Sequence, residues 1–205
     1  MQSVEQLLTT HPALKALFGQ LNKARVRWAI FAGSEVTLLT GNRASTDLDI
    51  IVHNDDFEKL VQLLPHAECV LGKSTPVTAG DGEKLKSIAD NLTFVLDGTD
   101  VDIMSRAWFE TKDGKFPTYL TELACEQRLT FSVAATTVYL AHPFDTILIK
   151  AFMRRGPEQN KHDQADAEAL CSQQRIERSY VAQRLAETGL NAGAEQFLKH
   201  LQLLI

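Results

Sequence analysis

The sequence predicts an α/β (α+β) fold, in which helices flank a mixed β-sheet and a C-terminal helical bundle packs on it. In residues 1–141, short apolar runs bounded by turn residues alternate with helical patterns, as in proteins that mix strands and helices. From His142 to the end of the 205 residues, the pattern is helical almost throughout. We therefore expect a mixed domain at 1–141 and a helical region at 142–205.

Leucine spacing, β-type runs and capping residues predict the first elements of the mixed domain. The expected order is one or two helices in 1–25, a strand at 25–32, a helix at 35–40, a strand at 47–52 and a helix at 55–64. Ser34 should cap the start of the helix at 35–40, and Gly41 should end it. Asn54 should cap the helix at 55–64.

The rest of the chain follows from turn residues and helical spacing. The mixed domain should continue with short strands near 68–71 and 75–78, strands at 92–96 and 100–104 around a glycine turn, a helix at 117–127 and an extended segment at 130–140. The helical region should contain helices at 143–155, 160–172, 176–188 and 191–204, with breaks at Gly156-Pro157 and at Gly189 and Gly193.

Composition indicates an ordinary globular protein, since 44% of the residues are hydrophobic and 23% are charged. The formal net charge of -5 argues against a broad basic surface for duplex nucleic acid. No apolar run approaches the ~20 residues that cross a bilayer, so we expect no membrane partner and a cytoplasmic location. Three scattered cysteines without a C-x-x-C pair indicate free thiols.

Two pairs of aspartates alternate along expected strands. Asp47 and Asp49 share one face of the strand at 47–52, and Asp100 and Asp102 share one face of a later strand. If these strands pair, a third carboxylate, from Asp102 or Asp100, reaches the first two. Such hard oxygen ligands suit Mg²⁺, and two ions about 3.5–4 Å apart are typical of phosphoryl transfer. The alternative is that Asp47 and Asp49 are solvated residues at a strand edge.

A glycine–serine step precedes these aspartates, with twelve residues between Ser34 and Asp47. Gly33 has no side chain, so its backbone can approach a triphosphate closely. The Ser34 hydroxyl and the N–H groups at the start of the next helix can donate to phosphate oxygens. Arg43 either contacts a phosphate or caps a loop. The alternative for Ser34 is a helix cap without a ligand.

The pattern G-S-x₁₂-D-L-D with a later V-D-I resembles the nucleotidyltransferase superfamily typified by DNA polymerase β. The resemblance implies a nucleotidyltransferase-like fold, with the mixed domain as its catalytic domain. It implies that Asp47 and Asp49 bind two Mg²⁺ ions, with Mn²⁺ as an alternative metal. Asp102 would complete the catalytic metal site and help to activate the acceptor hydroxyl. Gly33 and Ser34 would contact the phosphates of a nucleoside triphosphate (NTP).

The helical region resembles the tail of AbiEii-type and related bacterial nucleotidyltransferases, some of which are toxin components. The matching residues are Lys150, then Arg154 and Arg155, then Lys161-His162-Asp163-x₂-Asp166, in which His162 is an insertion. The resemblance implies that Lys150, with Lys161, neutralises triphosphate charge, and it allows an antitoxin partner. The alternative is an exposed Lys150, with Asp163 and Asp166 only stabilising the start of a helix.

The predicted function is Mg²⁺-dependent transfer of a nucleoside monophosphate (NMP) from an NTP to a hydroxyl acceptor, with release of pyrophosphate. The acceptor is tRNA, a protein or a small molecule, and tRNA would need a local basic strip at Arg25 and Arg27 or at Arg154 and Arg155. The alternative is a catalytically silent module of the same fold that binds a nucleotide or a partner protein. The absence of a G-x-S-x-G motif disfavours an α/β-hydrolase.

Overall fold

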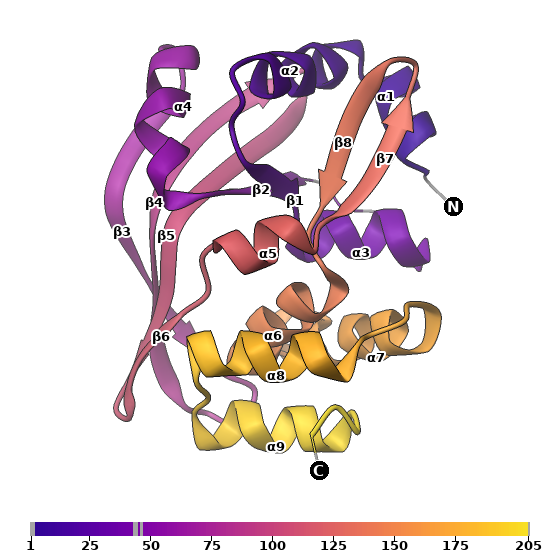
Figure 1. Ribbon diagram of the computed structural model, residues 1–205. Coiled ribbons are helices and arrows are strands. Elements are labelled where there is room, and N and C mark those ends of the chain that lie inside the picture. The colour runs from indigo at the N-terminus through magenta and orange to yellow at the C-terminus, as the bar shows by residue number, and fades with distance from the viewer. Residues whose placement is uncertain (1–2, 43–44, 46, 205) are drawn as a thin grey trace.

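A computed structural model of the chain describes residues 3–42, 45 and 47–204, and Figure 1 shows a sheet with helices on its faces and a helical layer beside it. Eight strands in the described residues form one mixed sheet, in the order β3-β4-β5-β2-β1-β8-β7, with β6 paired to β5. They are β1 (Trp28–Ile30), β2 (Asp47–Val52), β3 (Glu68–Thr78), β4 (Lys84–Leu96), β5 (Thr99–Thr111), β6 (Gly114–Pro117), β7 (Leu129–Val133) and β8 (Thr136–Leu140). The predicted fold class is confirmed.

The helices form two groups along the chain. Those among the strands are α1 (Val4–Thr10), α2 (Pro12–Lys23), α3 (Ala32–Thr40), α4 (Phe57–Leu63) and α5 (Glu122–Glu126). Those after the last strand are α6 (Pro143–Met153), α7 (Asp163–Gln173), α8 (Arg178–Thr188) and α9 (Ala192–His200), which confirms the predicted helical region. Its status as a separate domain stays a prediction. In the described part of the chain, no helix is both long and apolar enough to cross a bilayer.

One face of the sheet packs against α1, α2 and α4. Side chains that alternate along the strands, such as Trp28, Ile50 and Ile103, are fully buried in this core. Phe18 of α2 stacks on Trp28 with the ring centroids 4.7 Å apart. Because Asp49 alternates with Ile50 along β2, the same packing turns Asp49 to the opposite face.

A second hydrophobic cluster joins the C-terminal helices to the sheet. Phe109 of β5 and Phe116 of β6 contact Phe152 of α6, with ring centroids 5.1 and 5.2 Å from that of Phe152. The long strands β4 and β5 extend beyond β2, and α6 to α9 pack against these extensions (Figure 1). This packing brings α6 and the start of α7 beside the face that carries Asp49.

The elements around the glycine–serine step differ from the predicted bounds. The strand expected at 25–32 is reduced to β1, and α3 begins at Ala32 instead of at residue 35. Phe31 is the N-cap of α3, so Ser34 lies inside the first turn and the prediction of a Ser34 cap is wrong. Gly41 ends the helix with a φ of 67°, the left-handed conformation expected of a terminal glycine.

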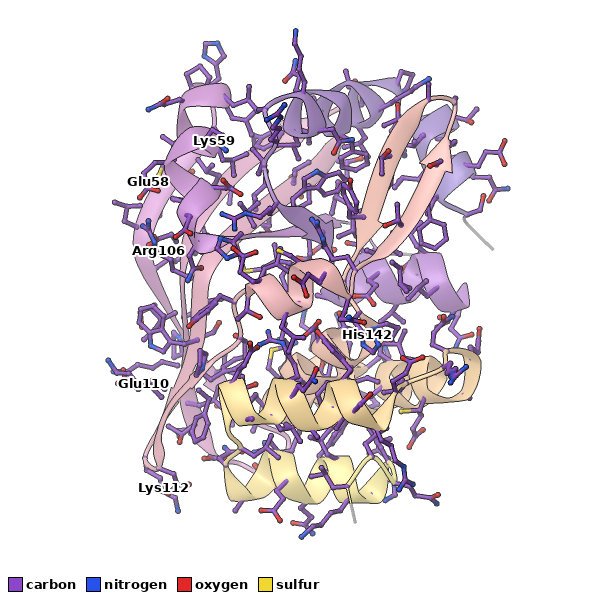
Figure 2. The ribbon with its side chains drawn as sticks, in the orientation of Figure 1. Glu58, Lys59, Arg106, Glu110, Lys112 and His142 are labelled. Atoms are coloured by element: carbon purple, nitrogen blue, oxygen red, sulfur yellow. The ribbon has the colours of Figure 1, made fainter. Side chains whose placement is uncertain are left out.

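The prediction that Asn54 caps the next helix is also wrong. A 3₁₀ turn precedes α4, and the Nδ1 of His53 accepts the backbone N–H of Asp55 there. Asn54 Oδ1 instead accepts the backbone N–H of Arg106 on β5 at 2.9 Å. Arg106 in turn pairs with Glu58 of α4, as Figure 2 shows. The side chain that the local sequence assigns to the cap is therefore used by a non-local contact with β5.

The strands in the middle of the chain are longer than predicted. The pieces expected at 68–71 and 75–78 form the single strand β3, which pairs antiparallel with β4. The strands expected at 92–96 and 100–104 are parts of β4 and β5, which meet at the predicted glycine turn. Hydrogen bonding to a neighbouring strand extends β3, β4 and β5 beyond the predicted bounds. A local sequence pattern does not predict such pairing.

Two further segments divide differently from the prediction. The extended segment expected at 130–140 is the hairpin of β7 and β8, and the helix expected at 117–127 is confined to α5. Ala134 and Ala135 form the hairpin turn with positive φ values of 45° and 65°. Asparagine and glycine are the usual residues in such a turn, so the sequence carries no signal for it.

Candidate active site

Three aspartates converge on the face of the sheet that carries Asp49. Asp47 and Asp49 lie on β2, and Asp102 pairs with Asp49 in the register of the parallel strand β5. One carboxylate oxygen from each lies within 4.8 Å of the other two. Asp100 pairs with Asp47 but does not belong to this cluster. Of the two candidates for the third carboxylate, the structure therefore places Asp102 in the cluster.

The carboxylates of this cluster destabilise one another when they are ionised. Burial, together with the neighbouring Asp47 and Asp102, raises the pKa of Asp49 to about 7, although Lys150 and Lys161 act to lower it. Burial is also the main cause of a raised pKa for Asp102. Closely spaced carboxylate oxygens are the donors that Mg²⁺ and Mn²⁺ take in proteins. These three residues therefore fit a divalent cation.

The start of α3 lies next to the aspartates. Ala32 has a φ of 54°, and Gly33 follows it on the wall of the cavity that contains Asp47 and Asp49. The backbone N–H groups of Gly33 and Ser34 have no hydrogen-bond partner among the described residues. Free N–H groups at a helix start bind phosphate oxygens. The backbone here is therefore suited to the predicted phosphate contact.

The Ser34 hydroxyl connects α3 to β2. It donates to the backbone carbonyl of Asp47 at 2.9 Å and accepts the backbone N–H of Asp49 at 3.0 Å. The side chain is buried. These two bonds hold the first turn of α3 against the strand that carries two of the aspartates. The phosphate contact predicted for Ser34 stays a prediction, and its free N–H is the group placed to make it.

A cavity of about 600 Å³ extends from the aspartates towards α6 and α7. Asp47 and Asp49 line one side of it, and the cationic side chains of Lys150, Arg155 and Lys161 line another. The apolar part of the wall comes from the sheet and α6, through Phe31, Ile51, Met104, Phe109, Ile149 and Met153. A cavity with this lining suits a ligand that is anionic at one end and has an apolar or aromatic body.

Lys150 of α6 is buried, so the alternative of an exposed helix residue is wrong. Its Nζ lies 2.7 Å from Asp166 Oδ2 and 3.4 Å from Asp163 Oδ1. Asp163 also accepts the backbone N–H and the Nε–H of Arg155, each at 2.9 Å. This network joins α6 to the start of α7 at the edge of the cavity. The contact of Lys150 with a triphosphate stays a prediction.

The other predicted basic residues have different surroundings. Lys161 is exposed and lines the cavity. Arg43 lies outside the described residues. Arg154 pairs through its guanidinium with Asp81 at 3.1 Å and with Glu83 at 2.8 Å, and its side chain is buried. The charge of Arg154 is therefore not available to the basic strip expected for tRNA.

Sequence reasoning missed several residues of this cavity. Arg155 was expected as part of the AbiEii-type match and of an RNA-binding strip, and it lies beside Asp163 on the cavity wall. Asn160 and His162 also line the wall, from the segment between α6 and α7. That segment carries no phosphate or metal motif. The signals available in this segment were its basic composition and the match of Lys161-His162-Asp163 to the AbiEii-type tail.

The sequence matches no family model and no curated protein. Solved structures match it in three dimensions. The solution structure of the antibiotic-resistance factor ANT(2'')-Ia is 10% identical, with 95% of this chain and 94% of that chain covered and a TM-score of 0.51. An antigenic nucleotidyltransferase-like protein from Paracoccidioides brasiliensis is 15% identical, with 96% and 94% of the two chains covered and a TM-score of 0.48.

A protein of Thermotoga maritima described as a candidate nucleotidyltransferase is 14% identical, with 68% of this chain and 79% of that chain covered and a TM-score of 0.48. At these identities the likeness concerns the fold, and the match to ANT(2'')-Ia is the one on which we rely. The match agrees with the glycine–serine and aspartate pattern of the sequence. The chain has the fold of the nucleotidyltransferase superfamily.

Proposed function

We propose that the protein is a Mg²⁺-dependent nucleotidyltransferase that transfers an NMP from an NTP to a hydroxyl acceptor and releases pyrophosphate. The observation that carries the proposal is the cluster of Asp47, Asp49 and Asp102, whose oxygens lie within 4.8 Å of one another. The free N–H groups at the start of α3 lie beside this cluster. Phosphoryl transfer needs a metal-ligating set next to groups that position and neutralise phosphate.

The three aspartates have separate tasks in this proposal. Asp47 and Asp49 hold Mg²⁺, or Mn²⁺, from β2, and Asp102 contributes a ligand from β5. A bound metal supplies Lewis-acid activation of the phosphate and of the attacking hydroxyl. Asp102 takes the proton from the acceptor hydroxyl. The acceptor oxygen then bonds to the α-phosphorus, the bond from that phosphorus to the bridging oxygen breaks, and pyrophosphate leaves.

The triphosphate lies between the start of α3 and the cationic side of the cavity. The N–H groups of Gly33 and Ser34 donate to its oxygens, because they have no other partner among the described residues. Lys161 and Lys150 offset the negative charge that grows on the leaving pyrophosphate. The apolar wall near Phe31 and Met153 then receives the less polar part of the nucleotide.

The acceptor approaches from the side of β5. A groove of about 380 Å³ beside Asp102 is lined in part by Glu68, Thr93 and Asp100. The register of the sheet pairs one residue from each of four neighbouring strands in a continuous cross-strand row. These residues are Glu68 of β3, Thr93 of β4, Asp102 of β5 and Asp49 of β2. Carboxylates along this row repel the phosphodiester backbone of RNA. Among tRNA, protein and small-molecule acceptors, we therefore favour a small molecule.

Transfer of label tests the proposal. The protein is incubated with Mg²⁺, each α-labelled NTP and separate pools of tRNA, proteins and small hydroxyl compounds. We expect label in the small-molecule pool, loss of transfer in Asp49→Asn, and unchanged transfer in Asp113→Asn, which removes an exposed carboxylate outside the cluster, the cavity and the groove. No transfer to any pool and no Mg²⁺–NTP binding in calorimetry would refute the proposal.

Calorimetry also separates the proposed enzyme from the catalytically silent module. Mg²⁺–NTP binding without transfer to any pool would indicate the silent module.

The AbiEii-type resemblance and the antitoxin partner stay predictions of the sequence. A cytoplasmic location stays a prediction as well.

A further inference from the structure

A carboxyl group with no role in the mechanism above is buried in the first turn of α3. Glu35 is 0% exposed, and its Oε2 lies 2.5 Å from the Oγ1 of Thr146 on α6, which is also 0% exposed. The other carboxyl oxygen, Oε1, has no hydrogen-bond partner among the described residues. Burial of a carboxyl group with one unsatisfied oxygen is costly, and a leucine would avoid that cost. Packing alone therefore does not account for a glutamate here.

The Thr146 hydroxyl connects this carboxyl group to the backbone that precedes Gly33. Thr146 Oγ1 donates to Glu35 and accepts the backbone N–H of Ala32 at 2.9 Å. Ala32 has a φ of 54°, in the left-handed region that a residue with a side chain rarely adopts. The hydrogen bond from the Ala32 N–H to Thr146 holds this conformation.

The conformation of Ala32 sets the direction of the next two peptide groups. The N–H groups of Gly33 and Ser34 follow directly and have no partner among the described residues. Gly33 lines the cavity beside Asp47 and Asp49. A change of φ at Ala32 would turn the Gly33 N–H away from the cavity. Contact between α6 and Ala32 therefore controls the groups that are placed to bind phosphate.

The charge state of Glu35 agrees with a position close to a triphosphate. Burial holds the pKa of Glu35 well above its usual range and Asp145 adds to this rise, whereas the hydrogen bond from Thr146 and the charge of Lys150 act to lower it. Burial therefore favours the protonated, neutral form of this carboxyl group. A neutral carboxyl group accepts the Thr146 hydrogen bond without repelling a bound polyanion.

We propose that Glu35 and Thr146 are positioning residues for the nucleotide, which act by holding Ala32 in the conformation that presents the Gly33 and Ser34 N–H groups to phosphate. The inference rests on the proposed function, since it concerns how the same site binds Mg²⁺–NTP. The two residues do not contact the nucleotide. They connect α6, which carries Lys150, to the backbone at the start of α3.

Substitutions of Thr146 test this inference. Thr146→Val keeps the shape of the side chain but removes the hydroxyl, so Ala32 and Glu35 both lose their partner. We expect Mg²⁺–NTP to bind about tenfold more weakly in calorimetry, the factor that corresponds to about 1.4 kcal/mol. Thr146→Ser keeps the hydroxyl and should bind as the wild type does. Glu35→Gln keeps an acceptor for Thr146 and should also retain most of the affinity.

Thr40→Val is the matched control. Thr40 is a buried threonine in the last turn of α3, and its hydroxyl donates to the Val36 carbonyl at 2.8 Å. Loss of this hydroxyl should lower the melting temperature but leave Mg²⁺–NTP affinity unchanged. Equal affinity in Thr146→Val and Thr40→Val would overturn the inference. If Thr146→Val does not fold, Thr146→Ala and Thr40→Ala provide the same comparison.

Hydrogen exchange separates a failure of this inference from a failure of the proposed function. Without any nucleotide, the amide of Ala32, which donates to Thr146 in the wild type, should exchange faster in Thr146→Val than in Thr40→Val. Unchanged exchange would contradict the positioning role, whatever the protein binds. If the wild type binds no Mg²⁺–NTP but exchange increases as expected, the proposed function is wrong and the control of this backbone by Thr146 is still supported.

Discussion

Asp102 of β5 pairs with Asp49 of β2 in a parallel register, and this pairing brings carboxylates from two distant segments within 4.8 Å of each other. Parallel strands need a long connection. Here the connection consists of α4 and the β3–β4 hairpin, which supplies the groove beside Asp102. The pairing thus defines the candidate metal site and places beside it the groove in which we propose that the acceptor binds.

Asp49→Asn should abolish the stabilisation of the protein by Mg²⁺–NTP. A ligand at about 100 times its Kd stabilises a protein by about 2.7 kcal/mol, and the variant loses the central carboxylate of the cluster. Differential scanning fluorimetry with and without Mg²⁺–NTP measures the effect. Asp100→Asn is the control and should keep the stabilisation. Equal loss in both variants would mean that the cluster in the structure is not the binding site.

Lys150→Met and Lys161→Met should differ in their effect on stability. Lys150→Met leaves two buried carboxylates without their lysine, which should cost on the order of 3–5 kcal/mol in urea unfolding. Lys161 is exposed, so Lys161→Met should change stability by no more than about 0.5 kcal/mol while weakening Mg²⁺–NTP binding. Strong destabilisation by Lys161→Met, or none by Lys150→Met, would contradict the network between α6 and α7.

Asp56 should contribute stability that depends on pH. Burial acts to raise the pKa of Asp56, but hydrogen bonds from Arg27 and Lys59 dominate and lower it from 3.8 to about 2. Because the folded-state pKa is depressed, this stability is present above about pH 4 and is lost as the pH falls through about 2. Asp56→Asn should cost about 2 kcal/mol at pH 7 and progressively less below pH 4.

Urea unfolding between pH 7 and pH 3 checks this prediction for Asp56. The control is Asp55→Asn, since the Asp55 side chain is 77% exposed and its closest Arg27 nitrogen is 3.7 Å away. That variant should change stability by about 0.5 kcal/mol or less at every pH. If the loss of unfolding free energy in Asp56→Asn does not vary with pH, the packing and not the charge of Asp56 stabilises the protein, and the prediction is wrong.

The three cysteines should react with a thiol reagent at different rates. All three are free, and Cys69 is the exposed one. Burial raises the pKa of Cys125 and of Cys171 to about 11, so little thiolate forms at pH 8. With Ellman's reagent we expect one fast thiol in the native protein and three after unfolding. A Cys69→Ser variant should lack the fast phase, and a remaining fast phase would contradict this assignment.

Local patterns were enough to predict the strand that carries Asp47 and Asp49. The alternation of apolar and polar residues assigns both aspartates to one face whatever the neighbours of the strand are, and β2 has the predicted bounds. The four helices after residue 142 were also predictable, because each has helical spacing, and α6 and α8 are followed by the breaks at Gly156-Pro157 and Gly189. These features depend on residues close together in the sequence.

Other features depended on contacts that no local pattern encodes. Ser34 has the composition of a helix cap, but its hydroxyl is used by the backbone of β2. Asn54 likewise bonds to β5 instead of capping α4. In both cases a polar side chain could form a hydrogen bond with the backbone of its own helix start. It forms one with the backbone of a strand distant in sequence, because packing against the sheet brings that backbone group within hydrogen-bond distance.

The amino-acid sequence determined which side chains of each strand face the same way, where glycine frees the backbone, and hence that a metal and a triphosphate could meet near residues 33–49. The tertiary structure decided that Asp102 and not Asp100 joins the cluster, that Lys150 is buried against α7, and that Thr146 holds Ala32. The physical reason is the range of the interactions. Alternation and backbone preference act within a few residues, whereas strand register and helix packing follow from the free energy of burying surfaces distant in sequence.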